Sequence, residues 1–262
     1  MIWDSFIWFA LPASLLWILG SVMVYLSKNS KLTDILIVSG IIILGIFIGM
    51  LWKELERPPL RTMGETRLWY SFFLALIGYI TYKHWNYKWL LGFSSLMAII
   101  FILVNLAKPE IHSKNLMPAL QSYWFIPHVT VYILSYATLG AATLAALVQI
   151  FQLSRNKPVN TVLIDFIDNI IYVGFSFLTL GMLLGAIWAK EAWGHYWSWD
   201  PKETWAFITA AAYLIYIHIR LRKFHLKLAL YFLPVAFALL MVTWVGVNYL
   251  PSAQNSIHTY SK

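Results

Sequence analysis

Long apolar runs separated by short polar segments dominate this sequence, and many of the runs approach the length that a helix needs to cross a bilayer. They predict eight helical spans, at residues 5–27, 35–52, 68–82, 89–107, 128–153, 166–189, 203–221 and 228–250. The third run is the weakest of these. The pattern therefore predicts an all-α, polytopic membrane helical bundle, and we expect residues 1–262 to form a single integral-membrane domain.

Composition supports a chain whose main solvent is lipid. Hydrophobic residues make up 60% and charged residues 11% of the 262 positions, and the mean hydropathy is +0.69. The net charge of +8 does not point to nucleic acid as a partner, because the basic residues lie in short turns between apolar runs. The absence of cysteine excludes a disulfide, a metal–thiolate bond and a thiol nucleophile.

The distribution of Lys and Arg predicts an orientation. Asp4 stands where a signal peptide would be basic and the first lysines follow the first run, which predicts a retained span. With the N-terminus outside, the short inner loops hold 10 of the 19 basic residues, namely Lys28, Lys31, Lys83, Lys88, Arg155, Lys157, Arg220, Arg222, Lys223 and Lys227. Because the number of spans is even, the segment before His128, residues 188–205 and the C-terminal tail share one side. We expect that side, with both termini, to be outside.

Residues 188–205, WAKEAWGHYWSWDPKETW, form what we call the tryptophan segment. Its five indoles are Trp188, Trp193, Trp197, Trp199 and Trp205. So many indoles in one segment are typical of a membrane interface or of a site for a large flat apolar ligand. The local order is more specific: Gly194 predicts a tight turn, and Asp200, Pro201 and Glu203 predict an N-cap, a first-turn proline and a capping-box acid. Capping and a ligand-binding role of Asp200 are compatible.

Histidines are the candidate metal ligands, because neutral imidazole commonly binds heme iron. His128 lies at the outer end of the fifth span and His258 lies beyond the end of the eighth, so both can reach the outer face. His218 lies 15 residues after Glu203, about 22 Å further along the helix, in the inner half of the membrane. An ionisable residue at that depth is a functional candidate, with an interhelical hydrogen bond as the alternative. His84 is a weaker candidate, and we expect the others, His112, His195 and His225, to be solvated.

Other charged residues are expected to be structural. The loop KELERPPLRTMGETR, residues 53–67, carries three arginines among three glutamates, which predicts an internally paired turn. An arginine of this loop that contacts heme propionates or a partner subunit is the alternative. Asp165 and Asp168 lie one helical turn apart near a predicted helix start, where acids favour the positive end of the dipole.

The tryptophan segment resembles the WWD domain of heme-handling proteins in cytochrome c biogenesis, most closely the CcsA (ResC) family of system II cytochrome c synthase subunits. WGHYWSWDPKETW continues into a helix that ends IYIHIRL. MPALQSYWFIPHVTVYILSY and GVNYLPSAQNSIHTYSK resemble the two external-histidine segments of that family, so the resemblance covers most of residues 117–260. In the system I proteins the aspartate is followed by residues other than Pro-Lys-Glu-Thr-Trp, which favours the CcsA type.

The resemblance implies a site and its ligand. His128 and His258 would be the axial ligands of an external heme b and the catalytic pair, and His218 would bind heme iron in transit from the inner side. The heme-binding surface would comprise Trp188, Trp193, Trp197, Trp199, Asp200 and Trp205. In this family heme is attached covalently to the CxxCH motif of apocytochrome c, whose two thiols add to the heme vinyl groups.

The resemblance also implies partners and a location. It suggests a holocytochrome c synthase subunit that is active with a CcsB-like membrane subunit, with apocytochrome c as substrate and thiol-reducing proteins as helpers. The expected location is the bacterial cytoplasmic membrane or a thylakoid-type membrane, with the active site facing the periplasm or outside. Two alternatives stay open: a heme exporter or chaperone of the system I type without ligation activity, and a b-type electron-transfer cytochrome.

Overall fold

The structure is a computed structural model that describes residues 2–27, 30–107, 118–222 and 225–251. Within these ranges the regular elements are eight α-helices and three short 3₁₀ helices, which confirms the predicted all-α class. The helices group into two compact units, unit 1 (Met1–Leu116) and unit 2 (Met117–Lys262). Whether they act as the single membrane domain expected from the sequence stays a prediction.

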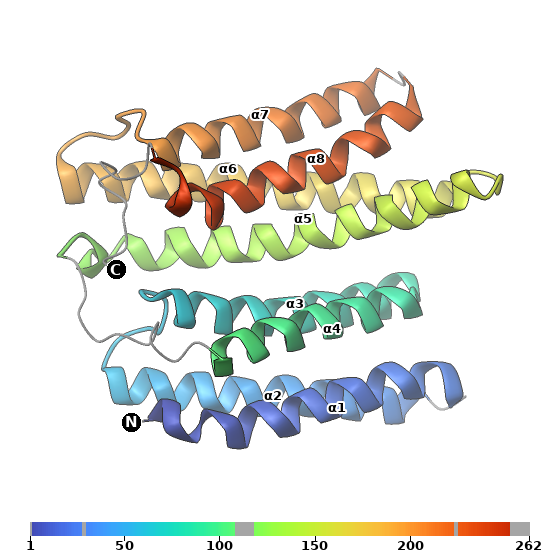
Figure 1. The fold of residues 1–262 in the computed structure, drawn as a ribbon, viewed down its shortest axis with the longest axis horizontal. Helices are drawn as coiled ribbons and strands as arrows, with labels where there is room; N and C mark the ends of the chain where they lie inside the picture. The colour runs from blue at the N-terminus through green and yellow to red at the C-terminus, as the bar shows by residue number, and fades with distance from the viewer. Residues whose placement is uncertain (1, 28–29, 108–117, 223–224, 252–262) are drawn as a thin grey trace. The chain divides into compact units, whose positions relative to one another are not determined.

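Unit 1 consists of two helical hairpins (Figure 1). Its elements are η1 (Ile2–Ser5), α1 (Phe6–Leu26), α2 (Ser30–Leu55), α3 (Met63–Trp85) and α4 (Lys88–Ala107). Helix α1 packs on α2 and α3 packs on α4, while α1 also contacts α4 and α2 contacts α3. The buried Trp17 indole of α1 donates to the Ile37 carbonyl of α2 at 3.3 Å, so a polar atom between these apolar helices is satisfied inside the unit.

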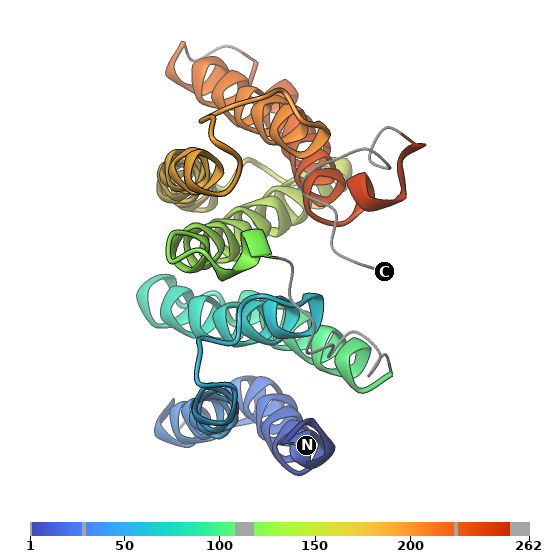
Figure 2. The same ribbon diagram turned by 90° about the vertical axis from the view of Figure 1, so that its left-hand side faces the viewer.

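Unit 2 contains the longest helices. Its elements are η3 (Pro118–Gln121), α5 (Phe125–Ser154), α6 (Thr161–Trp193), α7 (Pro201–Leu221), α8 (Leu226–Trp244) and η4 (Gly246–Tyr249). Helix α5 packs along α6 and α8, and α7 packs on α8 and α6. The start of α5, the end of α6, the start of α7 and the end of α8 lie at one end of the unit, which faces the viewer in Figure 2. The segment before His128 and the tryptophan segment therefore lie at the same end of unit 2, as predicted, while the C-terminal tail lies outside the described residues.

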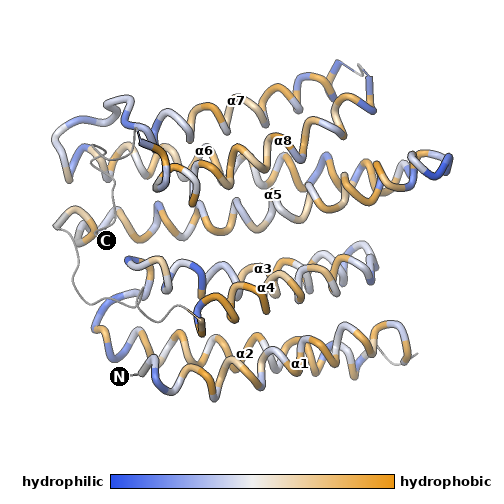
Figure 3. The backbone as a smooth tube through the Cα atoms, in the orientation of Figure 1, coloured by the Kyte–Doolittle hydropathy of each residue, from blue (hydrophilic) through white to orange (hydrophobic). Residues whose placement is uncertain are grey.

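Among the described residues, seven helices, α1, α2 and α4 to α8, are long and apolar enough to cross a membrane. Figure 3 shows apolar residues along these helices and polar residues gathered at several turns. Helix α3, which corresponds to the predicted third span, falls short of this apolarity. Its first turn carries Glu65 and its last turn carries Lys83 and His84, which lower its hydropathy. The helices are those of an integral membrane protein.

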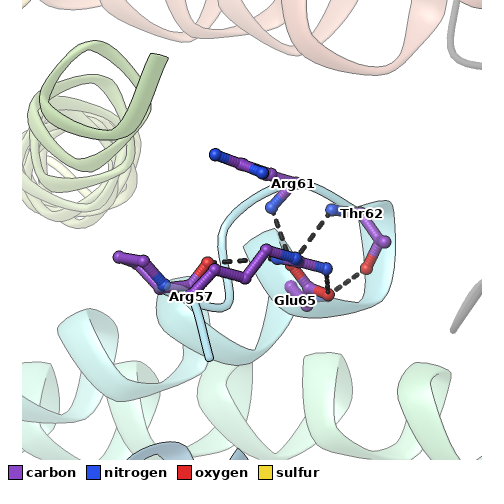
Figure 4. Close-up of polar contacts among 5 residues, drawn as sticks. Arg57, Arg61, Thr62 and Glu65 are labelled. Carbon is purple, nitrogen blue, oxygen red and sulfur yellow. Dashed lines mark hydrogen bonds and ion pairs between the residues drawn. The ribbon is translucent and has the colours of Figure 1, made fainter. Parts of the chain in front are cut away.

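A buried carboxylate organises the start of α3 (Figure 4). Glu65 is 2% exposed, and its two oxygens accept from the Arg57 guanidinium at 2.9 Å each. The backbone N–H groups of Arg61 and Thr62 donate to Glu65 Oε2 at 2.7 and 3.3 Å, and the Thr62 hydroxyl accepts from the Glu65 N–H at 3.2 Å. These bonds form a capping box together with an ion pair, which confirms the predicted internally paired turn for Arg57.

Positive charge is concentrated around this carboxylate. The Arg61 side chain extends away from Glu65 in Figure 4. Partial burial and the neighbouring Arg57 lower the pKa of Arg61 from its usual value, although Glu65 acts in the opposite direction. The negative charge of Glu65 therefore offsets the positive charges of Arg57 and Arg61, and its oxygens accept the hydrogen bonds of the turn.

Replacing Glu65 by Gln should destabilise unit 1. The amide keeps the shape but removes the charge that Arg57 and two backbone donors require, and breaking a buried pair costs about 3 kcal/mol or more. Glu56→Gln is the matched control, because it makes the same chemical change at an exposed position of the same turn. Thermal unfolding in detergent should show a lower midpoint for Glu65→Gln alone, and equal midpoints for the two variants would contradict the central role of Glu65.

Candidate functional site

The turn that opens the tryptophan segment depends on Gly194. This residue follows α6 with φ at 86°, in the left-handed region that a residue without Cβ adopts at little cost. Its N–H donates to the Lys190 carbonyl at 3.0 Å, and Lys190 Nζ donates to the Gly194 carbonyl at 2.7 Å. The predicted tight turn is confirmed, and it ends α6 at Trp193.

The other end of the loop is fixed by the N-cap of α7. Asp200 accepts from the Lys202 N–H at 3.0 Å, while Glu203 Oε2 accepts from the N–H groups of Asp200 and Ser198 at 3.2 and 2.7 Å. Both carboxylates are 8% exposed, and Pro201 is the first residue of the helix. The predicted capping box is confirmed. A ligand-binding role of Asp200 stays a prediction.

Trp199 stands out within this loop by its backbone conformation. Its φ of 58° lies in the left-handed region, which costs a residue with a side chain about 1 kcal/mol. The Thr204 hydroxyl donates to its carbonyl at 3.0 Å and helps to hold this conformation. The indole is 63% exposed and makes edge contacts with Trp197 and Phe207, at 5.9 and 5.7 Å between centroids. Backbone strain thus coincides with an exposed aromatic surface at a predicted site residue.

The indoles of the segment have different environments. Trp188 is 5% exposed, and its Nε1–H donates to the Ala119 carbonyl at 2.8 Å. Its ring contacts Phe125 at 5.0 Å and Trp193 at 4.8 Å between centroids. Trp205 lies within α7, where its carbonyl accepts from the Thr243 hydroxyl at 3.0 Å. The rings of Trp188 and Trp193 are in contact, and so are the rings of Trp197 and Trp199.

His128 lies in the first turn of α5 and packs against the end of α6. Its ring stacks on Trp188 at 5.4 Å and 24°, and it makes an edge contact with Tyr132 at 4.7 Å. Its Nδ1 is 2.8 Å from the Gly181 carbonyl oxygen of α6. The structure thus brings His128 together with one end of the tryptophan segment, as predicted. His258, the other predicted external ligand, lies outside the described residues.

The hydrogen bond to Gly181 determines the tautomer of neutral His128. A carbonyl oxygen can only accept, so Nδ1 carries the proton and the lone pair lies on Nε2. In histidines that bind metals, the ring nitrogen that does not contact the metal usually donates a hydrogen bond of this kind. His195 makes a similar bond to the Trp193 carbonyl at 2.8 Å, so the bond alone does not identify a ligand. The packing around His128 on α5 and α6 distinguishes it from His195, which is exposed in a turn.

His218 lies near the end of α7, at the end of unit 2 remote from the tryptophan segment (Figure 1). It is exposed, and its Nδ1 is 3.0 Å from the Leu214 carbonyl oxygen of its own helix, so neutral His218 also presents its lone pair on Nε2. The residues on either side tie α7 to α6. Arg220 binds Asp168 through two nitrogens at 2.7 and 2.9 Å, and the Tyr216 hydroxyl donates to the same carboxylate at 2.7 Å.

The surroundings of His128 can be compared with what an iron porphyrin needs from a protein. No group of three or more His, Asp or Glu side chains that could enclose an ion occurs in the part of the chain that the structure describes. A porphyrin supplies four nitrogen ligands of its own and needs only single axial ligands and apolar surface from the protein. Neutral His128 beside Trp188 and Trp193 offers both.

Comparison with known proteins identifies the family. The model of the family described as Cytochrome C assembly protein matches residues 7–253. The chain belongs to this family.

Similar proteins narrow the assignment within this family. The cytochrome c biogenesis protein CcsA of Chlamydomonas reinhardtii is 37% identical over 226 residues, which cover 80% of this chain and 62% of that protein. CcsA of Prochlorococcus marinus is 31% identical over 262 residues (86% and 83%), and CcsA of Cuscuta exaltata is 34% identical over 232 residues (75% of each). The chain thus spans less than two thirds of the length of the Chlamydomonas reinhardtii protein and more than two thirds of the lengths of the other two. The predicted resemblance to CcsA-type proteins is confirmed.

Membership of the cytochrome c assembly family implies heme handling and a role connected with apocytochrome c. It does not assign individual ligands, and the predicted site residues remain predictions. Sequence reasoning missed two interactions of this CcsA-type chain, the Gly181–His128 hydrogen bond and the Asp168–Arg220 pair. The second had a signal in the sequence. Asp168 lies near the start of one predicted span and Arg220 near the end of the next, and two consecutive antiparallel spans bring these ends to the same side. Asp168 has a structural role as expected, but for another reason: α6 begins at Thr161 with no acid in its first turn, and Asp168 pairs with Arg220 instead of lying at the helix start.

The two environments of the indoles predict different effects of truncation. Trp188→Ala should lower the free energy of unfolding by about 3 to 5 kcal/mol, because it empties a packed site. Trp188→Phe retains a ring against His128 and should cost about 1 kcal/mol for the lost hydrogen bond to Ala119. Trp199→Ala is the control and should leave the thermal midpoint in detergent nearly unchanged. A midpoint loss for Trp199→Ala as large as that for Trp188→Ala would show that the two indoles are equally structural.

Proposed function

We propose that this protein is the CcsA half of a system II cytochrome c synthase, which moves heme b to the outer membrane face and attaches it to the CxxCH motif of apocytochrome c. His128 and His258 hold the iron at the outer site, beside the tryptophan segment. The observation that carries the proposal is the placement of His128, whose tautomer is set by Gly181 and whose ring stacks on Trp188. Membership of the cytochrome c assembly family supports it independently.

The chemistry requires positioning more than acid–base catalysis. Each cysteine thiol of the substrate adds across one heme vinyl group: the sulfur forms the thioether bond, and a hydrogen is added to the other vinyl carbon. The addition needs no oxidant, and since this chain has no cysteine, both thiols come from apocytochrome c. The role of the protein is to hold porphyrin and peptide in the reacting orientation. Thiol-reducing proteins keep the substrate cysteines available.

The inner end of unit 2 supports a second heme contact. His218 is exposed on a helix that is apolar enough to span a membrane, and imidazole is costly to leave in lipid. We assign it to heme in transit from the inner side, with a CcsB-like subunit supplying the opposite axial ligand. The Asp168–Arg220 pair holds this part of α7 on α6 while His218 stays exposed. The tryptophan segment and both termini then face outside, in a bacterial cytoplasmic or a thylakoid-type membrane.

Replacing either external ligand should weaken heme retention and abolish cytochrome c synthesis. In His128→Ala and in His258→Ala, the low-spin, six-coordinate spectrum of bound heme should be lost, because iron lacks one axial nitrogen. His195→Ala is the matched control, since His195 makes a similar Nδ1 hydrogen bond but lies exposed in a turn. Wild-type heme spectra and cytochrome yields in both ligand variants would refute the external-ligand assignment.

Added imidazole should separate transit from attachment. In His218→Ala, free imidazole can occupy the lost ligand position and should restore holocytochrome c, because the outer site itself is unchanged. In His128→Ala or His258→Ala it should restore heme binding but not attachment, because a free ligand does not orient the vinyl groups. The measurement is covalent-heme staining of cytochrome c, with and without imidazole, at matched membrane levels of the three variants.

Three outcomes of this experiment decide between functions. Equal rescue of all three variants, or no loss in His218→Ala, would remove the case for an inner transit site. Heme that stays bound while no thioether forms even with a CcsB-like partner would favour a heme chaperone. Heme that never leaves the wild-type protein would favour a b-type electron-transfer cytochrome.

A further inference from the structure

Two glycines of α6 lie directly against the His128 side chain. Gly181 and Gly185 are separated by Met-Leu-Leu, a GxxxG spacing that lets membrane helices approach closely. The Gly181 carbonyl accepts the His128 Nδ1–H at 2.8 Å. A Cβ built on Gly185 would lie 2.6 Å from His128 Cε1 and 2.8 Å from Nδ1, closer than real Cβ contacts. One glycine therefore supplies the hydrogen-bond acceptor and the other supplies the space for the ring.

The imidazole has little freedom to avoid such an overlap. Trp188 stacks on it at 24°, Tyr132 meets it edge-on at 4.7 Å, and the bond to Gly181 holds its Nδ1. The atoms that a Cβ at Gly185 would meet belong to this rigid ring and not to the far end of a flexible chain. To make room, the ring must turn away from Gly181 or α5 must move away from α6.

We propose that Gly181 and Gly185 form an imidazole seat on α6, which positions His128 as an iron ligand. The seat sets the tautomer, leaving the lone pair on Nε2, and it sets the direction in which Nε2 points. Gly181 and Gly185 are positioning residues, because they act on iron through His128. This inference rests on the proposed role of His128 and adds the residues that make the ligand effective.

The same helix face offers a matched control. Gly174 lies seven residues before Gly181, on the same face of α6 against α5. Its carbonyl accepts from the Ser135 hydroxyl at 2.8 Å, and a Cβ there would lie 2.6 Å from Leu139 Cδ2. Gly174→Ala therefore makes a similar overlap with a leucine in place of the histidine, at the same pair of helices.

The first test measures heme. In the full-length protein, Gly185→Ala should reduce heme affinity about 10- to 100-fold and convert the low-spin spectrum to a high-spin one, approaching His128→Ala. Gly174→Ala should keep the low-spin spectrum even if its thermal midpoint falls. A wild-type spectrum in Gly185→Ala, with a lost spectrum in His128→Ala, would overturn the seat and leave the proposed function intact. An unchanged spectrum in His128→Ala would overturn the proposed function itself.

The second test needs no heme and covers the case in which Gly185→Ala is poorly stable. If the alanine acts by displacing the imidazole, removing that ring should relieve the overlap. Gly185→Ala should then lower the thermal midpoint of the apoprotein less in a His128→Ala background than in the wild type. Gly174→Ala should lower it equally in both backgrounds. Equal losses for Gly185→Ala in both backgrounds would show that the glycine serves helix packing alone and would overturn the inference.

Discussion

The close approach of α5 to α6 is the constraint on which the candidate site depends. Between lipid-facing helices little hydrophobic force holds the pair together, so packing and hydrogen bonds must do so. Glycines on α6 expose backbone carbonyls that accept from Ser135 and His128 of α5, at 2.8 Å in both cases. The contact that joins the helices is therefore also the contact that orients the candidate iron ligand, and neither role can be altered without the other.

Ion pairs and capping carboxylates hold several helix ends within each unit. In unit 1, Glu65 joins Arg57 to the first turn of α3. In unit 2, Asp168 joins Arg220 and Tyr216, while Asp200 and Glu203 close the opposite end by capping α7. An unpaired buried charge would cost several kcal/mol, so these pairs restrict how each helix end can move. The Gly194 turn and the α7 cap fix the two ends of the loop in which the strained Trp199 conformation persists.

Features set by neighbouring residues were predictable from the sequence. The apolar runs predicted the helices, Gly194 the left-handed turn and Asp200 the cap, because each depends on a few consecutive residues. The Gly181–His128 bond was not predictable, since its partners lie 53 residues apart and a GxxxG pattern does not name what it packs against. The separate environments of Trp188 and Trp199 also depend on tertiary packing, and the weak apolarity of the third run reappears in α3.

The two described candidate ligands differ in how firmly they are held, and the difference matches the roles proposed for them. His128 is held by a neighbouring helix and by stacked and edge-on rings, so its imidazole is oriented before any ligand arrives. His218 is exposed and its described hydrogen bond is to its own helix, so its side chain can adjust and release. A site where covalent bonds form needs a fixed porphyrin orientation, whereas a site on a route must bind weakly enough to let heme pass onward. The packed His128 and the exposed His218 therefore suit the attachment and transit roles proposed for them.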